Sequence, residues 1–361
     1  MSGLPPPLEI NPPLLNSACP WATTLDDLRR LYACPSTGAV TTRTSLIGGF
    51  DHDPAKHQYA FFDQGTHNAS PTPDTQKNAS LNSLGYSPLT LETYLDYIKT
   101  ISDELQLQPG NPTSKPRKGF IVSVTGGPDG IAASYAMISS AAQDVRFPLA
   151  MEINLSCPNI PGRPPPAYSE EALVTYLDRL QHAIFDPSVQ RPRIPVGIKT
   201  PPYTHATQYE GLMAALERAA DAEGGTGVCP VSFITATNTL GSCLVLGLEG
   251  EEGGREVEDG KGRDRALLAR FALPGSGLGG MAGAPLHPLA LGNVCTIRRM
   301  LDERADKLGH VRVIGVGGVL DAGGYRRMRA VGAHAVAVAT GLGLKGLPVF
   351  GEIEEGLRGR W

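Results

Sequence analysis

The feature that most constrains this chain is an alternation of short apolar runs with segments of helical periodicity. The runs are rich in β-branched or apolar residues, and each ends in Gly, Asn, Ser or Thr. We predict about eight strands, at residues 14–18, 38–42, 120–125, 149–155, 195–200, 231–237, 311–316 and 335–340. Amphipathic helices are predicted at residues 89–105, 169–184, 209–222, 290–308 and 323–331. This α/β alternation predicts a closed (β/α)8 TIM barrel.

The length of 361 residues suits one such domain, because a barrel takes about 250 residues and accepts loop insertions. Three polar, Pro-rich or Gly-rich stretches interrupt the alternation at residues 51–78, 106–118 and 247–270, and we predict surface insertions there, mostly loops. No repeat of fixed period and no clear linker divides the sequence. We therefore expect a single domain over residues 1–361.

Composition excludes several classes of protein. Apolar residues make up 41% and charged residues 19%, as in a chain that buries a large core. A net charge of -4 without a basic run argues against a nucleic-acid partner. No stretch is long and apolar enough for a membrane partner, and the start lacks a leader pattern, so we expect a cytoplasmic enzyme. The six scattered cysteines form no CxxC pair, and we predict no metal site and no disulfide framework.

Polar and reactive residues gather where the predicted strands end, which is where a barrel of this kind builds its active site. They are Asn16, Ser17, Thr42, Arg43, Thr44, Asn154, Cys157, Asn159, Lys199, Asn238, Thr239, Gly317, Gly318, Thr340 and Gly341. Any one of them could serve packing alone. Together they come from seven strand ends, and packing does not explain that distribution.

Cys157 is the candidate base. A lone cysteine is more often a small core residue, and we prefer that interpretation for the other five. Cys157, however, follows an apolar strand and lies between two asparagines, whose amides can orient a planar polar substrate. The Pro-rich stretch after it, residues 158–166, predicts a stiff loop that could cover the site.

Lys199 ends another predicted strand, so its ammonium should project into the barrel mouth and need an anionic partner. A reduced flavin or an anionic intermediate would serve. A surface lysine is disfavoured by the apolar strand before it. A Schiff-base lysine, as in barrel aldolases, stays open as an alternative.

Glycine clusters at residues 314–318 and 338–342 lie where the seventh and eighth strands of a barrel bind phosphate through backbone N–H groups. A third cluster, residues 275–280, could close over the same ligand. The pattern is not a dinucleotide fingerprint, because the following helix and the acidic ribose partner are not where that motif needs them. We therefore expect a mononucleotide phosphate such as that of FMN.

With these residues assembled, nearly the whole chain resembles the class 1 dihydroorotate dehydrogenases, most closely the fumarate-using, FMN-containing subgroup 1A. The resemblance is carried by residues 81–85, 154–168, 197–203, 238–241, 279–280 and 317–318. The segment Asn-Leu-Ser-Cys-Pro-Asn at 154–159 is the most specific, because a cysteine base separates class 1 from the membrane-associated class 2 enzymes, which use serine.

The resemblance implies a function in pyrimidine biosynthesis. Cys157 would remove the C5 proton of dihydroorotate while the C6 hydride passes to the flavin, and the reduced FMN would then pass its hydride to fumarate. The implied substrate-binding residues are Arg43, Asn82, Leu84, Gly85, Tyr86, Asn154, Asn159, Asn238 and Thr239. The implied FMN-binding residues are Ser17, Ala18, Thr42, Arg43, Thr44, Asn154, Lys199, Gly279, Gly280, Gly317, Gly318, Thr340 and Gly341. Relatives of this kind are homodimers, so a homodimer is expected.

Three residues depart from the family pattern. Arg43 stands where lysine is usual, Tyr86 where a smaller apolar residue is usual, and Cys19 where glycine is usual. Arginine keeps the charge but is longer and planar, so the exchange is not conservative. These changes leave open a related FMN oxidoreductase that acts on another cyclic or unsaturated acid. A non-catalytic ligand-binding barrel is disfavoured, because binding alone would not need the base.

Overall fold

The computed structural model describes residues 4–106, 118–157, 165–186, 188, 190–222, 227–248 and 269–361. Its centre is a closed barrel of eight parallel strands in the order β1-β15-β14-β9-β8-β7-β6-β2. These strands are β1 (Leu14–Asn16), β2 (Ala39–Thr41), β6 (Gly119–Val124), β7 (Leu149–Asn154), β8 (Val196–Thr200), β9 (Phe233–Ala236), β14 (Arg312–Val316) and β15 (Ala335–Val338). All eight predicted strands and the predicted (β/α)8 fold are confirmed.

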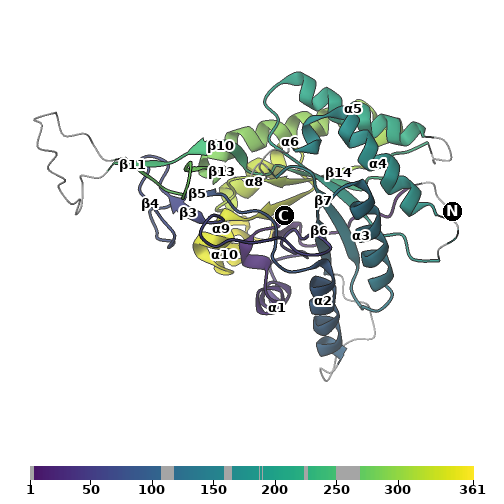
Figure 1. The fold of residues 1–361 in the computed structure, drawn as a ribbon, viewed down its shortest axis with the longest axis horizontal. Coiled ribbons are helices and arrows are strands. Elements are labelled where there is room, and N and C mark those ends of the chain that lie inside the picture. Colours follow the sequence, from purple (N-terminus) through teal and green to yellow (C-terminus); the bar gives the residue numbers. More distant parts are fainter. Residues whose placement is uncertain are drawn as a thin grey trace, which may run out of the picture.

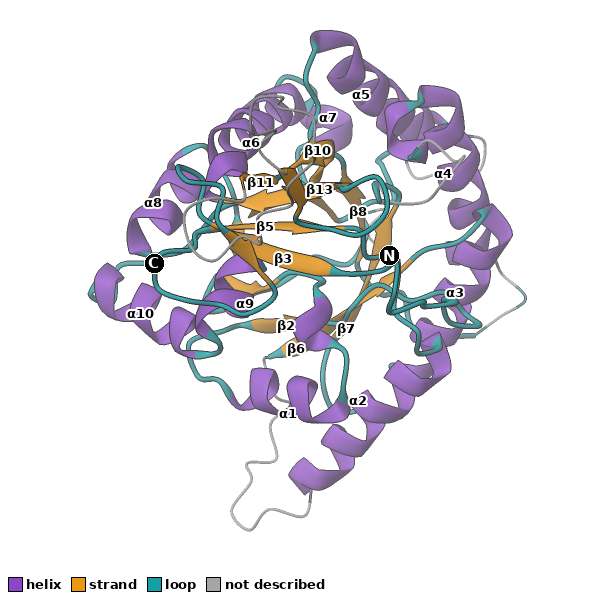
Figure 2. Cartoon of the chain, turned by 60° about the vertical axis from the view of Figure 1, so that its left-hand side comes forward, coloured by secondary structure: helices purple, strands orange, loops and turns teal. Residues whose placement is uncertain are grey.

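Helices surround the barrel (Figure 2). They are α1 (Leu25–Ala33), α2 (Leu91–Gln106), α3 (Pro128–Ala141), α4 (Glu170–Ile184), α5 (Ala206–Asp221), α6 (His287–Asp302), α7 (Ala305–Leu308), α8 (Ala322–Ala330), α9 (Thr340–Lys345) and α10 (Pro348–Leu357). The five predicted helical segments are confirmed, although the segment at 290–308 is divided between α6 and α7. The helices α1, α3, α9 and α10 were not predicted. Thr24 and Asp27 form a capping box at the start of α1. The faces of α3 differ little in hydrophobicity, so the helix gives only a weak amphipathic pattern.

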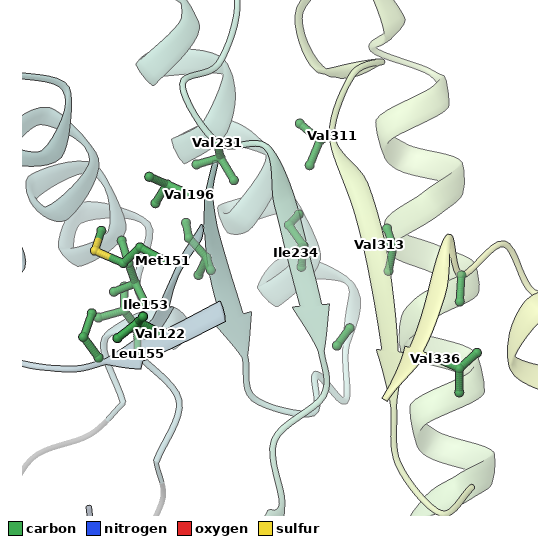
Figure 3. Packing of buried hydrophobic residues seen from close by; sticks show 14 of the residues in the cluster. Val122, Met151, Ile153, Leu155, Val196, Val231, Ile234, Val311, Val313 and Val336 are labelled. Carbon is green, nitrogen blue, oxygen red and sulfur yellow. The ribbon is translucent and has the colours of Figure 1, made fainter. Parts of the chain in front are cut away.

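Alternate residues of each strand face opposite sides of the barrel wall. Val122, Met151 and Ile234 point outward and pack under the helices (Figure 3). Ile121 and Phe233 instead belong to the cluster that fills the interior. A Cβ on Gly197 would lie 2.2 Å from the Phe233 ring, so the glycine makes room for that ring. Burial of a phenylalanine of this kind stabilises the fold by about 1.5–3 kcal/mol.

A second sheet lies beside the barrel and projects to the left in Figure 1. Its antiparallel order is β10-β13-β5-β3-β4, and a separate pair joins β11 to β12. The strands are β3 (Tyr59–Phe62), β4 (Ala69–Ser70), β5 (Ala79–Asn82), β10 (Leu240–Leu244), β11 (Leu246–Leu248), β12 (Ala269–Phe271) and β13 (Leu278–Gly283).

This second sheet corrects part of the prediction of loops at residues 51–78, most of which are loops or turns. That stretch contains β3 and β4, and it is ordered because Phe61 and Phe62 are buried and β3 pairs with β5. The loops predicted at 106–118 and 247–270 fall almost wholly outside the described residues, which reach only their edges. Within the described ranges, no helix is long and apolar enough to cross a membrane.

Candidate active site

A cavity of about 770 Å³ opens at the C-terminal ends of the barrel strands. The second sheet supplies part of its wall through Tyr59, Ser80 and Asn82. Many residues predicted from the sequence meet here. They are Ala18, Arg43, Thr44, Asn82, Leu84, Gly85, Tyr86, Asn154, Cys157, Lys199, Asn238, Thr239 and Thr340.

A smaller cavity of about 450 Å³ adjoins the first and shares several wall residues with it, among them Lys199 and Thr340. Ser17, Gly317 and Gly318 line this second space. The predicted phosphate glycines and the predicted base therefore lie along one continuous wall. That arrangement suits an elongated ligand.

Five predicted residues are not among the described residues that line these two cavities. Asn159 lies outside the described part of the chain. Thr42 is inside the barrel wall, where its hydroxyl accepts a hydrogen bond from the Ser123 N–H at 3.1 Å. Gly341 packs against Val338: a Cβ on Gly341 would lie 2.9 Å from a methyl carbon of that valine.

Gly279 and Gly280, the other two, belong to β13. A Cβ on Gly280 would lie 2.2 Å from the Thr239 hydroxyl, and one on Gly279 would lie 2.5 Å from the Asn82 carbonyl oxygen. These glycines permit close strand packing. Ala282 and Gly283, at the end of β13, line the smaller cavity, and Ala282 also lines the larger one.

The amides beside Cys157 are fixed by hydrogen bonds. Asn154 follows the barrel wall at the end of β7, and its Nδ2 donates to the Thr44 hydroxyl at 3.1 Å. Its Oδ1 accepts from the Ser156 hydroxyl at 2.9 Å and from Asn238 Nδ2 at 3.2 Å. Such a network holds planar amides in one orientation before a ligand arrives.

Below these amides, a chain of hydroxyls runs to a buried carboxylate. The Thr44 hydroxyl lies 2.9 Å from the Ser123 hydroxyl, which donates to Glu152 Oε1 at 2.9 Å. Thr235 donates to Glu152 Oε2 at 2.7 Å. Sequence reasoning missed Glu152, because an acidic residue inside a strand gives no signal of what it contacts.

The loop after β5, which also lines the cavity, is held in place too. Leu84 N–H donates to Asn82 Oδ1 at 3.2 Å, and Arg43 Nη2 donates to the Tyr86 carbonyl oxygen at 3.2 Å. A Cβ on Gly85 would lie 2.3 Å from the Phe50 ring, which packs over this loop. Phe50 was not predicted, since its contact depends on a loop geometry that the sequence does not display.

The cavity carries positive charge. Lys199 is buried and donates to the Ser17 hydroxyl at 3.1 Å, while burial lowers the pKa of Arg43. In the described part of the chain, neither cation forms an ion pair, and no residue lining the cavity has a carboxylate. A buried cation is costly without an anionic partner. The cavity therefore favours an anionic ligand.

Cys19 lies in the same wall but differs from Cys157 in its setting. Its thiol is fully buried, and burial raises its pKa to about 12, although Lys199 and Arg43 act in the opposite direction. A thiol of this kind is inert at neutral pH. Cys157, which is partly exposed to the cavity, is the better placed of the two to exchange a proton.

The glycine-lined end of the smaller cavity, predicted to hold a phosphate, depends on backbone shape. Gly317 and Gly318 have φ values of 136° and 68°, and a Cβ on Gly318 would lie 2.5 Å from the Gly283 carbonyl oxygen. His287 Nδ1 lies 2.7 Å from the Gly317 carbonyl oxygen, and Arg327 Nε donates to His287 Nε2 at 3.0 Å. His287 is thus held as the tautomer that donates from Nδ1. Neither His287 nor Arg327 was predicted.

Comparison with known proteins gives a consistent result. A family model described as dihydroorotate dehydrogenase matches residues 63–360. The dihydroorotate dehydrogenase (fumarate) of Trypanosoma cruzi is 28% identical over 346 residues, covering 96% of this chain and 88% of that protein. Dihydroorotate dehydrogenase A (fumarate) of Lactococcus lactis subsp. cremoris is 25% identical over 341 residues, covering 94% and 88%.

Among solved structures, a dihydroorotate dehydrogenase of Eimeria tenella in complex with ferulenol superimposes with a TM-score of 0.63. The match covers 96% of this chain and 80% of that one, at 16% sequence identity. At this identity the likeness supports the shared fold alone.

Proposed function

The chain belongs to the class 1 dihydroorotate dehydrogenase family, and we propose that it oxidises dihydroorotate to orotate with FMN as cofactor and fumarate as electron acceptor. The proposal rests on the set of residues that line one cavity. A thiol, fixed amides and two cations without an ion-pair partner line it, and no carboxylate does so in the described residues. Such a wall suits a planar, amide-containing acid.

The residues present fit a flavin mononucleotide. Gly317 and Gly318 line the smaller cavity, which runs from them to Lys199. A Cβ on Gly317 would strike Ala290 and one on Gly318 the Gly283 carbonyl oxygen, so only glycine allows the backbone to take this path along the cavity. Backbone N–H groups beside these glycines would hold the phosphate, and the Lys199 ammonium would lie against the ring system. FMN, when bound there, supplies the acceptor for the hydride from C6 of the substrate.

The side chains of this chain would do the rest. Asn82, Asn154 and Asn238 would hydrogen-bond the pyrimidine ring, and Asn159 would join them. Arg43 and the backbone of residues 84–86 would hold the substrate carboxylate. Cys157 would take the C5 proton on its sulfur, and that proton must leave the sulfur before the next oxidation. Fumarate would bind to the same cations, since it is also an acid.

The visible spectrum before and after anaerobic addition of dihydroorotate tests this function. We expect a yellow protein that dihydroorotate bleaches and fumarate reoxidises. Cys157→Ala should keep the flavin and slow bleaching about 10²- to 10⁴-fold, the usual contribution of a general base. Cys295→Ala is the matched control, because Cys295 is exposed and lies outside the cavity. A colourless protein that takes up no FMN, or unchanged turnover in Cys157→Ala, would contradict the proposal.

A second candidate function follows from Arg43 and Tyr86, which depart from the family pattern and lie together in the cavity wall, where Arg43 Nη2 donates to the Tyr86 carbonyl oxygen. Here the flavin binds, but another cyclic or unsaturated acid is the substrate. Dihydroorotate would then fail to bleach the wild-type protein. The double substitution Arg43→Lys with Tyr86→Leu should restore some bleaching. If it restores none, these two residues do not set the substrate.

We also propose that the chain is one domain that forms a homodimer. A single core cluster contains residues from Leu14 to Leu357, which supports the single domain. Light scattering on the purified protein tests the dimer, and a mass of one chain, 38.2 kDa, would contradict it.

A further inference from the structure

Glu152 is a buried carboxylate that the proposed reaction does not use. Its side chain points into the barrel, because it follows Ala150 of the interior cluster by two residues on β7, and 2% of its surface is exposed. Its Oε1 accepts from the Ser123 hydroxyl at 2.9 Å, and its Oε2 accepts from the Thr235 hydroxyl at 2.7 Å. An ionised carboxylate has no proton and can only accept, so both hydroxyls point their protons at it.

The direction of these bonds is passed on toward the cavity. Since Ser123 donates to Glu152, its oxygen is left to accept, and the proton of its 2.9 Å bond with Thr44 comes from Thr44. Thr44 has then committed its one proton, so toward Asn154 it can only accept. It does so from Asn154 Nδ2 at 3.1 Å. The buried carboxylate thereby requires the nitrogen of the Asn154 amide to face Thr44.

The other end of this chain of hydrogen bonds begins at a backbone donor. The Ser156 N–H, which can only donate, meets Asn154 Oδ1 at 3.2 Å. A fixed donor at Ser156 and a fixed acceptor at Glu152 thus require the same orientation of the Asn154 amide. Every hydroxyl and amide between them has one direction in which all bonds are made.

This direction decides which amide atoms are left for a ligand. Asn154 Oδ1 also accepts from the Ser156 hydroxyl and from Asn238 Nδ2, and Asn238 Nδ2 donates to the Ser156 hydroxyl as well. Asn238 Oδ1 accepts from the Thr239 N–H at 2.8 Å. Among the described residues, one Nδ2 proton of Asn154 and one lone pair of Asn238 Oδ1 then have no partner. Both residues line the larger cavity, which therefore offers a donor beside an acceptor.

We infer that Glu152 is a positioning residue: as the terminal acceptor of the hydroxyl chain, it holds the Asn154 amide in the orientation that offers a donor beside an acceptor to a cyclic amide or imide. The inference rests on the proposed function for its choice of ligand, because orotate carries such an edge and fumarate carries none. Glu152 is not among the described residues that line either cavity, so it acts through hydrogen-bond direction alone.

A neutral amide at position 152 would break the agreement between the two ends. A glutamine there carries an NH2 group, which must donate either to Ser123 or to Thr235. Donation to Ser123 reverses the chain, so that Thr44 turns its proton to Asn154 and the amide meets a donor on both sides. Donation to Thr235 keeps the chain but takes away the acceptor of the Thr235 proton. Without the Thr235 hydroxyl, the reversed chain is the one that remains.

The test is the Kd of orotate and of fumarate, measured by isothermal titration calorimetry on the flavin-containing protein with samples matched for flavin absorbance. Thr235→Val keeps the carboxylate and its bond with Ser123, so both Kd values should stay at those of wild type. Adding Glu152→Gln to Thr235→Val reverses the chain. The Kd of orotate should then rise about 3- to 10-fold, as for the loss of one hydrogen bond, while the Kd of fumarate stays unchanged.

A second variant, Ser123→Ala, cuts the chain between Glu152 and Thr44 and leaves both in place. The Thr44 proton loses its acceptor in the chain and can turn to Asn154, so orotate should again weaken and fumarate should not. This variant decides the question if the double variant does not fold. Ser134→Ala is the matched control, because this buried serine donates to the Gly130 carbonyl oxygen within α3, and its loss should alter neither Kd.

Weaker orotate binding with unchanged fumarate binding, in the double variant and in Ser123→Ala, supports the inference. Equal losses for the two ligands, an unchanged Kd of orotate, or a wild type that binds no orotate would overturn it. Bleaching decides the proposed function separately. If wild type binds orotate with the expected response to the variants but dihydroorotate does not bleach it, the function fails and the inference stands. If dihydroorotate bleaches it and the variants leave orotate binding unchanged, the inference fails and the function stands.

Discussion

The two ends of the barrel treat a lysine side chain in opposite ways. At the N-terminal end, Lys118 precedes β6 and donates to the carbonyl oxygens of Leu31 and Cys34 at 2.8 Å and to the Thr37 hydroxyl at 2.6 Å. At the C-terminal mouth, Lys199 donates to the Ser17 hydroxyl at 3.1 Å. The protein satisfies the first cation itself, and leaves the second for a ligand. We therefore expect Lys118, at the N-terminal end, to contribute to stability and Lys199, at the C-terminal mouth, to contribute to ligand binding.

The largest expected effect is at the mouth. Lys199→Met should weaken FMN binding about 10- to 100-fold, since a hydrogen bond to a charged group contributes about 1.5–3 kcal/mol. The free energy of unfolding of the flavin-free protein should not fall, because the variant removes a poorly satisfied buried charge. Flavin titration and urea unfolding of the flavin-free protein measure the two quantities. A clear loss of stability without flavin would break the contrast between the two ends.

Lys118→Met should give the opposite result. Two carbonyl oxygens and a hydroxyl lose their donor, which should lower the free energy of unfolding by about 1–3 kcal/mol, while FMN affinity stays unchanged. The exposed Lys56 supplies a control substitution, Lys56→Met, that should alter neither quantity. If Lys118→Met also weakens flavin binding, the N-terminal end is coupled to the mouth.

The smallest expected effect is a pH dependence. Burial lowers the pKa of Lys118 from its ordinary value of 10.5 to about 8. Between these values the unfolded chain binds more protons at this site than the folded chain, so the free energy of unfolding should rise with pH. We expect a rise on the order of 1 kcal/mol in wild type relative to Lys118→Met. Urea unfolding at pH 8 and near pH 10 measures it, and parallel profiles would refute the assignment.

The barrel and much of the mouth could be predicted from the sequence, because local patterns determine them. Asn154, Cys157 and Lys199 each follow a buried strand, and parallel strands bring their C-terminal ends together. The second sheet could not be predicted in this way. Its strands β5 and β13 join Asn82 to Gly280, nearly two hundred residues later, and β13 is too rich in glycine to look like a strand.

The same limit applies to the contacts of other glycines and to the supporting side chains that were not predicted. Gly279 and Gly280 were predicted to bind the cofactor from their place in a glycine cluster, and the sequence gives no sign that Asn82 and Thr239 pack closely against them. His287 supports Gly317 from thirty residues away, and no spacing in the sequence indicates that contact. A side chain that holds another group in place can be recognised only once the fold shows which residues it contacts.

The filled interior of the barrel has a kinetic consequence. Phe233 and its neighbours close the space below the cavity, so in the described part of the chain the mouth is the route in and out. Under the proposed function, orotate must then depart before fumarate occupies the same place. Turnover would alternate between two half-reactions, and initial-rate plots against dihydroorotate at several fumarate concentrations would be parallel lines.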